Sequence, residues 1–381
     1  MKVPFYRHQL TADDATQIAA VLATPILTSG QVGRDVEGQI ASFFGVKDAL
    51  LVNSWTNGAV ACLLAMDIGP GDEVIVPAMT FIATANIVEL IGAKPVFVDV
   101  DPLTLMLTPD SVKAALTART KAVIPVHLYG QMADVGALRE AIGHDIKIIE
   151  DCAHSFESSL NGDKPGAHSD AAIFSFYATK NVTCGEGGAI ITRNPDLAHQ
   201  LRVTRLHGMS AGAIDRYRSG TYTHWDMKRL GVKANLPDLL AALLPAQLEQ
   251  LQPKLDQRTF LAERYQHAFA AEPEISTQAN IAGAKHAWHL FAICVRPELR
   301  DPLILALNAA GIGCAVNFRS VPTMTYYRET YGYTPADFPV SELWGSGTIS
   351  LPLFPGLTNE EQSYVIDTVR RELASLARHA A

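Results

Sequence analysis

The segment A-A-I-F-S-F-Y-A-T-K-N-V-T-C-G-E-G-G-A-I-I-T, residues 171–192, contains two apolar runs separated by a polar, glycine-containing turn. The runs Ala171–Phe176 and Gly188–Thr192 are short and rich in β-branched or aromatic residues, as is typical of buried strands. The second run follows too soon for a helical crossover, so the chain must make a tight return. The segment therefore predicts an antiparallel pair within a mixed sheet, with Lys180 in the turn.

The same alternation of strand and helix patterns begins upstream, at about residue 48. Further strand-like runs are Ala49–Asn53, Glu73–Pro77, Pro95–Val100, Ala122–His127 and Ile146–Glu150. Several of these runs are apolar almost throughout, which favours strands that are covered on both faces. Amphipathic stretches such as Thr108–Leu116 and Ala133–Ile142 lie between them. The pattern predicts an α/β layered fold with a mostly parallel sheet.

The pattern changes in the C-terminal third of the chain. Residues 236–267 look continuously helical, with Pro245 and Pro253 as kinks or restarts. Beyond them, a strand at Trp288–Val295, a helix at Asp301–Ala310 and a strand at Gly347–Leu351 are expected. We therefore expect a large domain over residues 1–250 and a smaller α+β domain over residues 251–381.

Composition narrows the class of protein. The chain is 48% hydrophobic and 18% charged, with a net charge of −8, as is usual for a globular protein. An acidic balance argues against sequence-independent nucleic-acid binding. The five cysteines are scattered and never paired as C-x-x-C, so neither a disulfide framework nor a metal site is expected. The N-terminus has no signal-peptide pattern and no apolar run reaches membrane-spanning length, so we expect a soluble, cytoplasmic protein.

Two residues at predicted strand ends stand out, because ligands of open α/β sheets bind beyond the carboxyl ends of the strands. Asp151 ends the run I-I-E-D-C-A-H, and Lys180 follows the run that ends at Phe176. Taken singly, Asp151 reads as a helix N-cap and Lys180 as a solvated loop residue. Taken together, they match the needs of pyridoxal-5′-phosphate (PLP) chemistry. That chemistry requires a lysine for the Schiff base and a carboxylate for the pyridine nitrogen.

The surrounding residues resemble the DegT/DnrJ/EryC1/StrS family of nucleotide-sugar aminotransferases. Within that family the chain is most similar to 4-keto-sugar aminotransferases of the kind that makes UDP-4-amino-4-deoxy-L-arabinose. The segments that carry the resemblance, besides those around Asp151 and Lys180, are G-D-E-V-I-V-P-A-M-T-F (71–81), F-V-D-V-D-P-L-T-L (97–105), I-P-V-H-L-Y-G (124–130), H-A-W-H-L-F (286–291) and S-L-P-L-F-P (350–355). The resemblance extends from Phe5 to the C-terminal helix. It implies the type I, aspartate aminotransferase-like fold of PLP-dependent transferases.

The resemblance also implies roles for individual residues. Lys180 would form the aldimine and shuttle the proton, and Asp151 would pair with the pyridine nitrogen. The remaining cofactor contacts would come from His154 near the ring hydroxyl, Phe81 stacked on the ring, and Ser54, Trp55, Thr56 and Ser175 around the phosphate. Core packing is an equally good explanation of Phe81. Asn235 would reach the phosphate of a partner subunit, so the active site would be shared within a homodimer.

The chain departs from the family pattern at two positions. Trp55 stands where relatives carry Gly or Ala, so its ring must point away from the phosphate or line the sugar pocket. Asn317, in N-F-R-S, stands where close relatives carry a histidine on the substrate side. Arg319 is retained as a substrate-binding candidate, and a surface ion pair explains it equally well.

A stretch rich in Gly, Tyr and Arg over residues 211–233 has the length of a functional loop. It contains Asp215, Arg216, Lys228 and Arg229. We hypothesise that part of it covers a nucleotide diphosphate, with Arg229 as a contact. A solvated charge cluster explains the pattern equally well.

The implied reaction transfers the amino group of L-glutamate, through pyridoxamine phosphate, to the 4-keto carbon of a UDP- or dTDP-linked sugar for a lipopolysaccharide or other glycan. Alternatives are amination of a 3-keto nucleotide sugar, a pyridoxamine-dependent sugar dehydratase, and a non-enzymatic PLP-fold regulator. The dehydratases of the family carry His in place of the lysine, so Lys180 argues against that reaction. The base, the sugar and its stereochemistry do not follow from the sequence.

Overall fold

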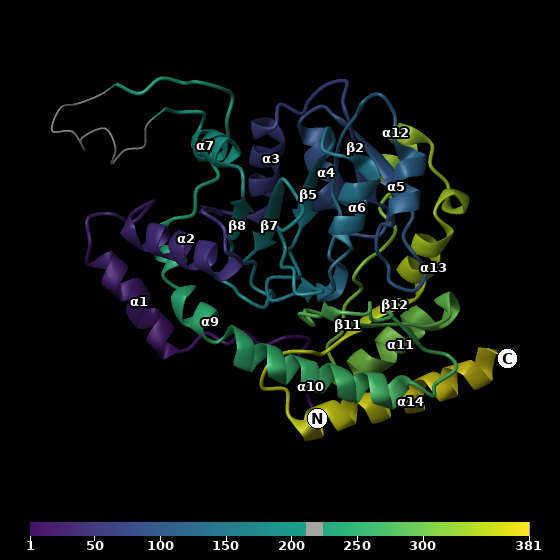
Figure 1. Cartoon of the computed structure of the whole chain (residues 1–381). Coiled ribbons are helices and arrows are strands. Elements are labelled where there is room, and N and C mark those ends of the chain that lie inside the picture. Colours follow the sequence, from purple (N-terminus) through teal and green to yellow (C-terminus); the bar gives the residue numbers. More distant parts are fainter. Residues whose placement is uncertain (211–223, 381) are drawn as a thin grey trace.

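The computed structural model describes residues 1–210 and 224–380, and its centre is a seven-stranded sheet in the order β1-β8-β7-β5-β4-β2-β3 (Figure 1). The strands are β1 (Asp48–Val52), β2 (Glu73–Pro77), β3 (Lys94–Val98), β4 (Thr120–Val123), β5 (Lys147–Asp151), β7 (Ala171–Ser175) and β8 (Gly188–Thr192). Strand β8 runs antiparallel to both of its neighbours, and the remaining pairs are parallel. The predicted mixed, mostly parallel sheet is confirmed.

Helices cover both faces of this sheet because alternate strand residues point to opposite sides. Leu50 and Val52 pack with α3 (Trp55–Ala65), α4 (Ala83–Leu90) and α7 (Pro195–Thr204).

On the other face, one cluster contains residues of α2 (Gln31–Phe44), and a second contains residues of α5 (Pro109–Ala115) and α6 (Val135–Ile142). The apolar runs of the sequence are thus explained by burial from two sides.

The helix predicted over residues 236–267 is not continuous. It divides into α8 (Asp238–Ala241), α9 (Pro245–Glu249) and α10 (Leu251–Phe269). Pro245 has no N–H to donate and begins α9 as its first residue. Pro253 lies in the first turn of α10, where a missing N–H breaks no helical bond.

The C-terminal part of the chain has a hydrophobic core of its own. Strand β11 (Phe291–Cys294) lies between β12 (Thr348–Leu351) and β9 (Ser276–Thr277), and both pairs are antiparallel. Helices α10, α11 (Pro297–Ala309) and α14 (Asn359–Ala380) pack around them, and Val3 of the N-terminal segment joins the same core (Figure 1). A domain boundary at residue 250 stays a prediction.

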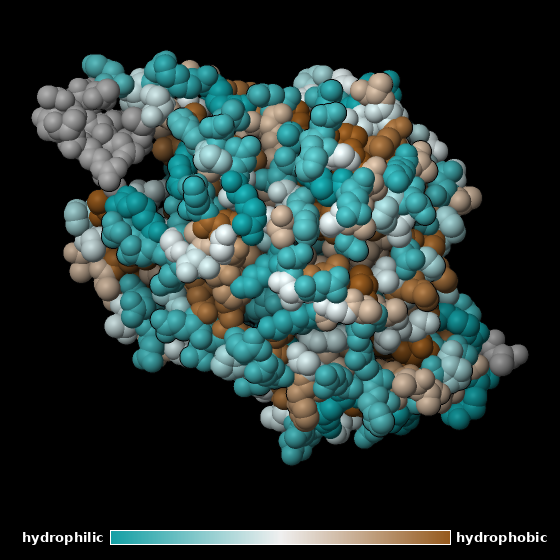
Figure 2. All heavy atoms as spheres, in the orientation of Figure 1, coloured by the Kyte–Doolittle hydropathy of each residue, from teal (hydrophilic) through white to brown (hydrophobic). Residues whose placement is uncertain are grey.

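The structure also contains α1 (Ala12–Leu22), α12 (Thr325–Tyr331), α13 (Pro339–Gly347), and a short antiparallel pair of β6 (Ser159–Leu160) with β10 (Ala284–Lys285). The face seen in Figure 2 is mainly hydrophilic, with apolar residues in small scattered groups. Among the described residues, no helix combines the length and apolar character needed to cross a bilayer.

A buried carboxylate from a distant part of the chain caps helix α2. Asp238 is 3% exposed, and its Oδ1 accepts hydrogen bonds from the backbone N–H groups of Gly30 (2.8 Å) and Gly33 (3.0 Å). Its Oδ2 accepts a third bond, from Val32 N–H at 3.2 Å. A Cβ at Gly30 would lie 2.3 Å from the same carboxylate, so glycine is required there. Asp238 therefore supplies the N-cap that α2 lacks locally.

We expect Asp238→Ala to lower the free energy of unfolding by about 2–3 kcal/mol, because three buried N–H groups lose a charged acceptor. Urea denaturation of the purified protein measures this change. The control is Asp35→Ala on the exposed side of the same helix, for which we expect a change of about 0.5 kcal/mol or less. Equal effects of the two substitutions would contradict the assignment of Asp238 as the cap.

Candidate active site

A cavity of about 530 Å³ lies where the carboxyl ends of β5 and β7 meet the first turn of α3 and the C-terminal part of the chain. The cavity brings together most of the residues that the sequence singled out: Ser54, Trp55, Thr56, Phe81, Asp151, His154, Ser175, Lys180 and Asn317. This position, beyond the strand ends, is the expected one for a ligand of an α/β sheet.

Asp151 is the last residue of β5 and is only 5% exposed. Its Oδ2 accepts a hydrogen bond from Thr84 Oγ1 (2.9 Å), and its Oδ1 accepts one from the backbone N–H of Ala153 (3.0 Å). No helix follows it directly, so the N-cap explanation does not apply. Burial raises the pKa of the Asp151 carboxyl, and the two hydrogen bonds and Lys180 oppose that rise. A cation bound beside it would stabilise the ionised form.

Lys180 lies in the turn after β7, and its backbone N–H donates to Tyr177 O at 2.9 Å. Burial lowers the pKa of its amine to about 8, and the Asp151 carboxylate partly opposes the shift. A substantial fraction of the amine is therefore neutral near pH 8, which is the state that a nucleophile or a general base needs.

The first turn of α3 forms a second side of the cavity. Ser54 is the N-cap, and its Oγ accepts from Asn57 N–H at 3.1 Å. A Cβ at Gly188 would lie 3.1 Å from Trp55 N and 2.5 Å from Phe174 O, so a glycine is needed for the helix to begin this close to the sheet. A helix N-terminus attracts anions through its free N–H groups and its dipole.

The structure explains how the chain accommodates Trp55 at a position where the family pattern has Gly or Ala. Its ring is 6% exposed and belongs to the core, and its Nε1–H donates to Ile173 O of β7 at 3.1 Å. The indole thus points into the sheet while its backbone remains in the first turn of α3. A bulky residue is tolerated here because the side chain fills the core beneath the helix.

Aromatic rings cover the remaining sides. Phe81 is 55% exposed and lines the cavity, and its ring centroid lies 5.7 Å from that of Phe318. Core packing therefore does not explain Phe81. The ring of His154 lies between Phe318, at 5.8 Å, and His289, at 4.4 Å.

The protonation state of His154 follows from its contacts. Its Nδ1 accepts from Tyr129 N–H at 3.2 Å, so the neutral ring carries its hydrogen on Nε2. Burial and the neighbouring cation of Lys180 lower the pKa of His154 well below its usual value. At neutral pH His154 is therefore an uncharged hydrogen-bond donor.

Three predicted site residues lie outside the cavity. Arg229 donates to Leu64 O and to Asp67 Oδ1 (2.6 Å), at the C-terminal end of α3. In this structure Arg229 therefore caps a helix, and the nucleotide contact predicted for it stays a prediction. Arg319 is exposed and is not a cavity residue. Asn235 pairs with Val52, the last residue of β1, and its Nδ2 donates to Ser29 Oγ at 2.7 Å.

Three further charged residues belong to the stretch over residues 211–233. Lys228 is exposed and forms an ion pair with Asp226 at 2.8 Å. Asp215 and Arg216 lie outside the described residues.

Sequence reasoning missed two kinds of cavity residue. Thr84 bonds to Asp151, and Thr80 bonds to Thr84 (3.0 Å). In the sequence, the only sign of this pair was two threonines spaced four residues apart, one just before α4 and one in its first turn. His289 belongs to the motif H-A-W-H-L-F, which had no role assigned to its residues.

A buried group of possible metal ligands flanks Asp151 without lining the cavity. His127, Glu150 and Cys152 have ligand atoms within 4.8 Å of one another. His127 Nδ1 accepts from Ala133 N–H (3.1 Å), and its Nε2 bonds to Glu150 Oε2 (2.6 Å). Both ring nitrogens are thus engaged, and the group is explained as a hydrogen-bonded element of the core.

The fold places this chain among the PLP-dependent aminotransferases, the class to which its structural relatives belong. The sequence profile of the DegT/DnrJ/EryC1/StrS aminotransferase family matches residues 8–370, and the chain belongs to that family. It is therefore an enzyme of the aminotransferase class.

Solved structures agree along the whole chain. A protein of Streptococcus pneumoniae assigned as a sugar aminotransferase, in its apo-form, superposes with a TM-score of 0.92 at 27% identity, covering 100% of both chains. The same protein has been solved in PMP and PLP forms. The S. venezuelae protein DesV, in complex with a ketimine intermediate, superposes with a TM-score of 0.90 at 33% identity, covering 97% of this chain and 98% of that one.

The cavity fits the PLP cofactor of this family. A protonated pyridine nitrogen would give the buried Asp151 carboxylate the cation that it lacks. The first turn of α3, held close to the sheet by Gly188, would receive the phosphate. Lys180 lines the same cavity with a readily deprotonated amine. Together, the carboxylate, the helix N-terminus and the amine suit a ligand that has a cationic group at one end and an anionic group at the other.

We expect the rate of covalent labelling of Lys180 by a small lysine reagent to rise with pH, with a midpoint at about 8 in the apoprotein. Only the neutral amine reacts, and its fraction increases as the pH rises through the pKa. Peptide mass spectrometry measures the rate, with the exposed Lys121 as an internal reference for the reagent.

The companion variant is Asp151→Asn. The Asp151 carboxylate raises the pKa of Lys180, so its loss should move the labelling midpoint below that of the wild type. A midpoint that stays unchanged or moves to higher pH would mean that the two groups do not interact.

Proposed function

We propose that this enzyme transfers the amino group of L-glutamate to the 4-keto carbon of a nucleotide-linked sugar, with UDP or dTDP as the nucleotide. The observation that carries the proposal is the single cavity that joins Asp151, Lys180 and the first turn of α3. The family of sugar aminotransferases to which the structural relatives belong supports the sugar as acceptor. The 4-keto position and the glutamate donor rest on the sequence resemblance alone.

In the proposed reaction the protein binds, orients and moves protons. When bound, the pyridine ring of PLP supplies an electron sink. The Asp151 carboxylate holds the nitrogen end by charge, and Thr84 and Ala153 keep that carboxylate aimed into the cavity. Ser54, Thr56 and Ser175, with the first turn of α3, hold the phosphate end.

Lys180 performs the proton transfers. Its Nζ, when neutral, takes a proton from Cα of the amino donor, and in the second half-reaction it returns a proton to the carbon of the sugar that receives nitrogen. A pKa near 8 suits a group that must act as base and then as acid. His154, with its hydrogen on Nε2, would be able to donate to the ring hydroxyl oxygen of bound PLP, and because it is uncharged it adds no competing positive charge beside Lys180.

The sugar end of the cavity is proposed to lie near Phe81, Phe318 and Asn317. Asn317 Oδ1 is buried without a hydrogen-bond partner in the described structure, and it belongs to a residue that lines the cavity. A sugar hydroxyl would satisfy this oxygen, and a buried acceptor left unpaired is costly. The aromatic rings of Phe81 and Phe318 would pack on the apolar faces of the sugar.

We expect the purified protein with PLP to show a visible absorbance band that is lost on adding L-glutamate, as the bound cofactor is converted to the pyridoxamine form. Lys180→Ala should lack this band, because the lysine amine is needed to form the chromophore. Spectrophotometry before and after addition measures both. A wild-type band that ignores L-glutamate and every other amino donor would rule out the proposed half-reaction.

The acceptor is tested with the glutamate-treated enzyme. A panel of 4-keto and 3-keto sugars, each linked to UDP or dTDP, should restore the visible band only with a 4-keto member. If only 3-keto sugars restore the visible band, the carbon that receives the amino group is carbon 3 and not carbon 4. Release of a dehydrated sugar without amination would favour the dehydratase alternative, which Lys180 argues against.

We also propose a homodimer in which Asn235 of one chain contacts the phosphate site of the other. Within one chain Asn235 is held to Ser29 and is not a cavity residue, so it has no role in its own cofactor site. A cytoplasmic location is proposed as well and agrees with the five free thiols. Fractionation of the source cells tests that location. The aminated sugar is proposed to enter a lipopolysaccharide or other glycan.

Mixing two impaired variants tests the shared site. We expect the Lys180→Ala and Asn235→Asp variants to have low glutamate-dependent turnover when each is assayed alone. Asn235→Asp should be impaired because a carboxylate repels the phosphate. In a hybrid dimer one site combines an intact Lys180 with the other chain's intact Asn235, so glutamate-dependent turnover should recover. Hybrids that form, as native mass spectrometry would reveal, but stay inactive would exclude the exchange.

A further inference from the structure

The turn that carries Lys180 is anchored by the residue after it. Asn181 Nδ2 donates to Glu157 Oε2 (3.2 Å) and to Ala287 O (3.0 Å). Glu157 forms a buried ion pair with Arg258 of α10, and Arg258 Nε donates to the same carbonyl of Ala287 at 3.0 Å. The turn is thereby tied to a segment that leads into β11 and to helix α10.

The carbonyl end of the Asn181 amide faces His289. His289 Nδ1 lies 3.2 Å from Asn181 Oδ1. The Asn181 NH₂ group donates to two oxygens, on Glu157 and Ala287. The amide oxygen is therefore the atom that faces His289. An amide oxygen only accepts, and His289 Nδ1 must therefore carry the hydrogen. In this tautomer His289 Nε2 is unprotonated.

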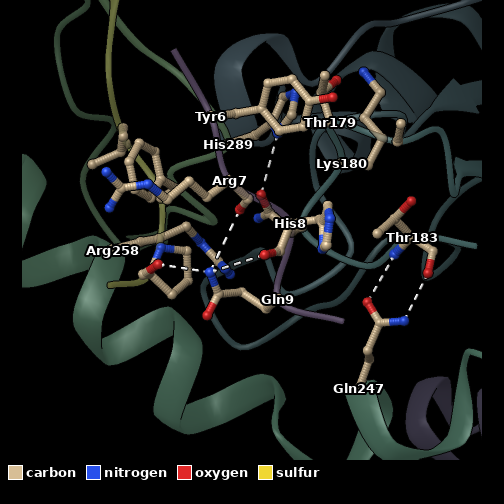
Figure 3. A pocket seen from close by; sticks show the side chains of 15 residues that line it. Tyr6, Arg7, His8, Gln9, Thr179, Lys180, Thr183, Gln247, Arg258 and His289 are labelled. Carbon is tan, nitrogen blue, oxygen red and sulfur yellow. Dashed lines mark hydrogen bonds between the residues drawn. The ribbon is translucent and has the colours of Figure 1, made fainter. Parts of the chain in front are cut away.

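The other contact of His289 is the face of His154. The two ring centroids are 4.4 Å apart, and both rings are nearly buried. His289 also lines the cavity that holds Lys180, and it lines a second, smaller pocket together with Tyr6, Thr179 and Lys180, which Figure 3 shows. One side chain thus touches both the lysine-bearing turn and the imidazole that donates into the cofactor site.

A purely structural role is the main alternative, and His286 illustrates what such a role looks like. It lies in the same segment and is also buried. Its Nδ1 accepts from Trp288 N–H (2.8 Å), and its ring stacks on Trp288 at 3.8 Å. Burial lowers the pKa of His286 to about 3. Its hydrogen bonds go to Trp288 and Gln278, away from Asn181 and His154.

We propose that His289 is a positioning residue of the amino-transfer site, which holds the Lys180 turn through Asn181 and fixes the ring of His154 by contact. The proposal rests on the proposed function, since the two groups it positions are those that move protons and hold the cofactor. Both anchors act at once, so a displacement of either should lower turnover more than binding.

Two variants separate the two contacts. His289→Asn keeps a donor at the position of Nδ1 and loses the ring, whereas His289→Phe keeps the ring and loses the donor. We expect His289→Phe to lower kcat by about tenfold or more through the lost hydrogen bond, and His289→Asn to lower it by about threefold or more through the lost ring contact, with KM for both substrates changed by about twofold at most. His286→Phe, the same substitution three residues earlier, should leave kcat unchanged even if it lowers the melting temperature.

A measurement on the apoprotein tests the same idea without turnover. With ¹⁵N-labelled histidine, long-range NMR correlations should show His289 protonated at Nδ1 and His154 protonated at Nε2 across about pH 6.5 to 8.5, and His289→Asn, which loses the ring, should broaden or shift the His154 signals. An Nε2–H tautomer or an imidazolium at His289 would overturn the proposal, as would a kcat of His289→Phe equal to that of the wild type.

The failure of this inference differs from a failure of the proposed function. A wild type that responds to L-glutamate while both His289 variants match it would leave amino transfer intact and remove His289. A wild type that ignores every amino donor would remove the proposed function, and the tautomers of the apoprotein would still decide whether His289 anchors the lysine turn.

Discussion

A carboxylate that is buried beside a lysine in the same cavity is the constraint on which the rest of this structure depends. Asp151 is held where water cannot stabilise its charge, and the pKa values of Asp151 and Lys180 move toward the neutral forms in consequence. The arrangement persists only because the surrounding chain fixes it. Thr84 and the N–H of Ala153 aim the carboxylate, and Asn181 anchors the turn beside the lysine. Such a pair is poised for a ligand that brings a positive charge to the carboxylate and an electrophile to the amine.

The sheet supplies the geometry for this pair because its strands end at one edge. Strand β5 delivers Asp151 and β7 delivers the lysine turn, and the antiparallel β8 brings Gly188 beneath the first turn of α3. The hydrophobic core accommodates the side chain of Trp55, whose backbone belongs to the first turn of α3. The Trp55 indole is packed into the core, with its Nε1–H bonded to Ile173 O.

The sheet could be predicted from the sequence because strands buried on both faces have a strong local signature. β2 and β8 begin and end where the apolar runs do. Asp151 and Lys180 followed from their places at strand ends, and their neighbours from a family resemblance. What could not be predicted depends on contacts between distant residues. The cap that Asp238 gives α2 and the hydrogen bonds of Arg229 at the end of α3 both have partners with no marker in the local sequence.

The place of Val3 has a consequence for how the chain reaches this state. Val3 packs in the C-terminal core, and its backbone pairs with Gly311 O and Gly313 N–H at 2.9 and 2.8 Å. During synthesis this segment emerges before the central sheet, and its partners emerge after it. The sheet can order around its own contacts in the meantime, whereas the C-terminal core needs both segments. The C-terminal core can therefore be completed only after the central sheet has been synthesised.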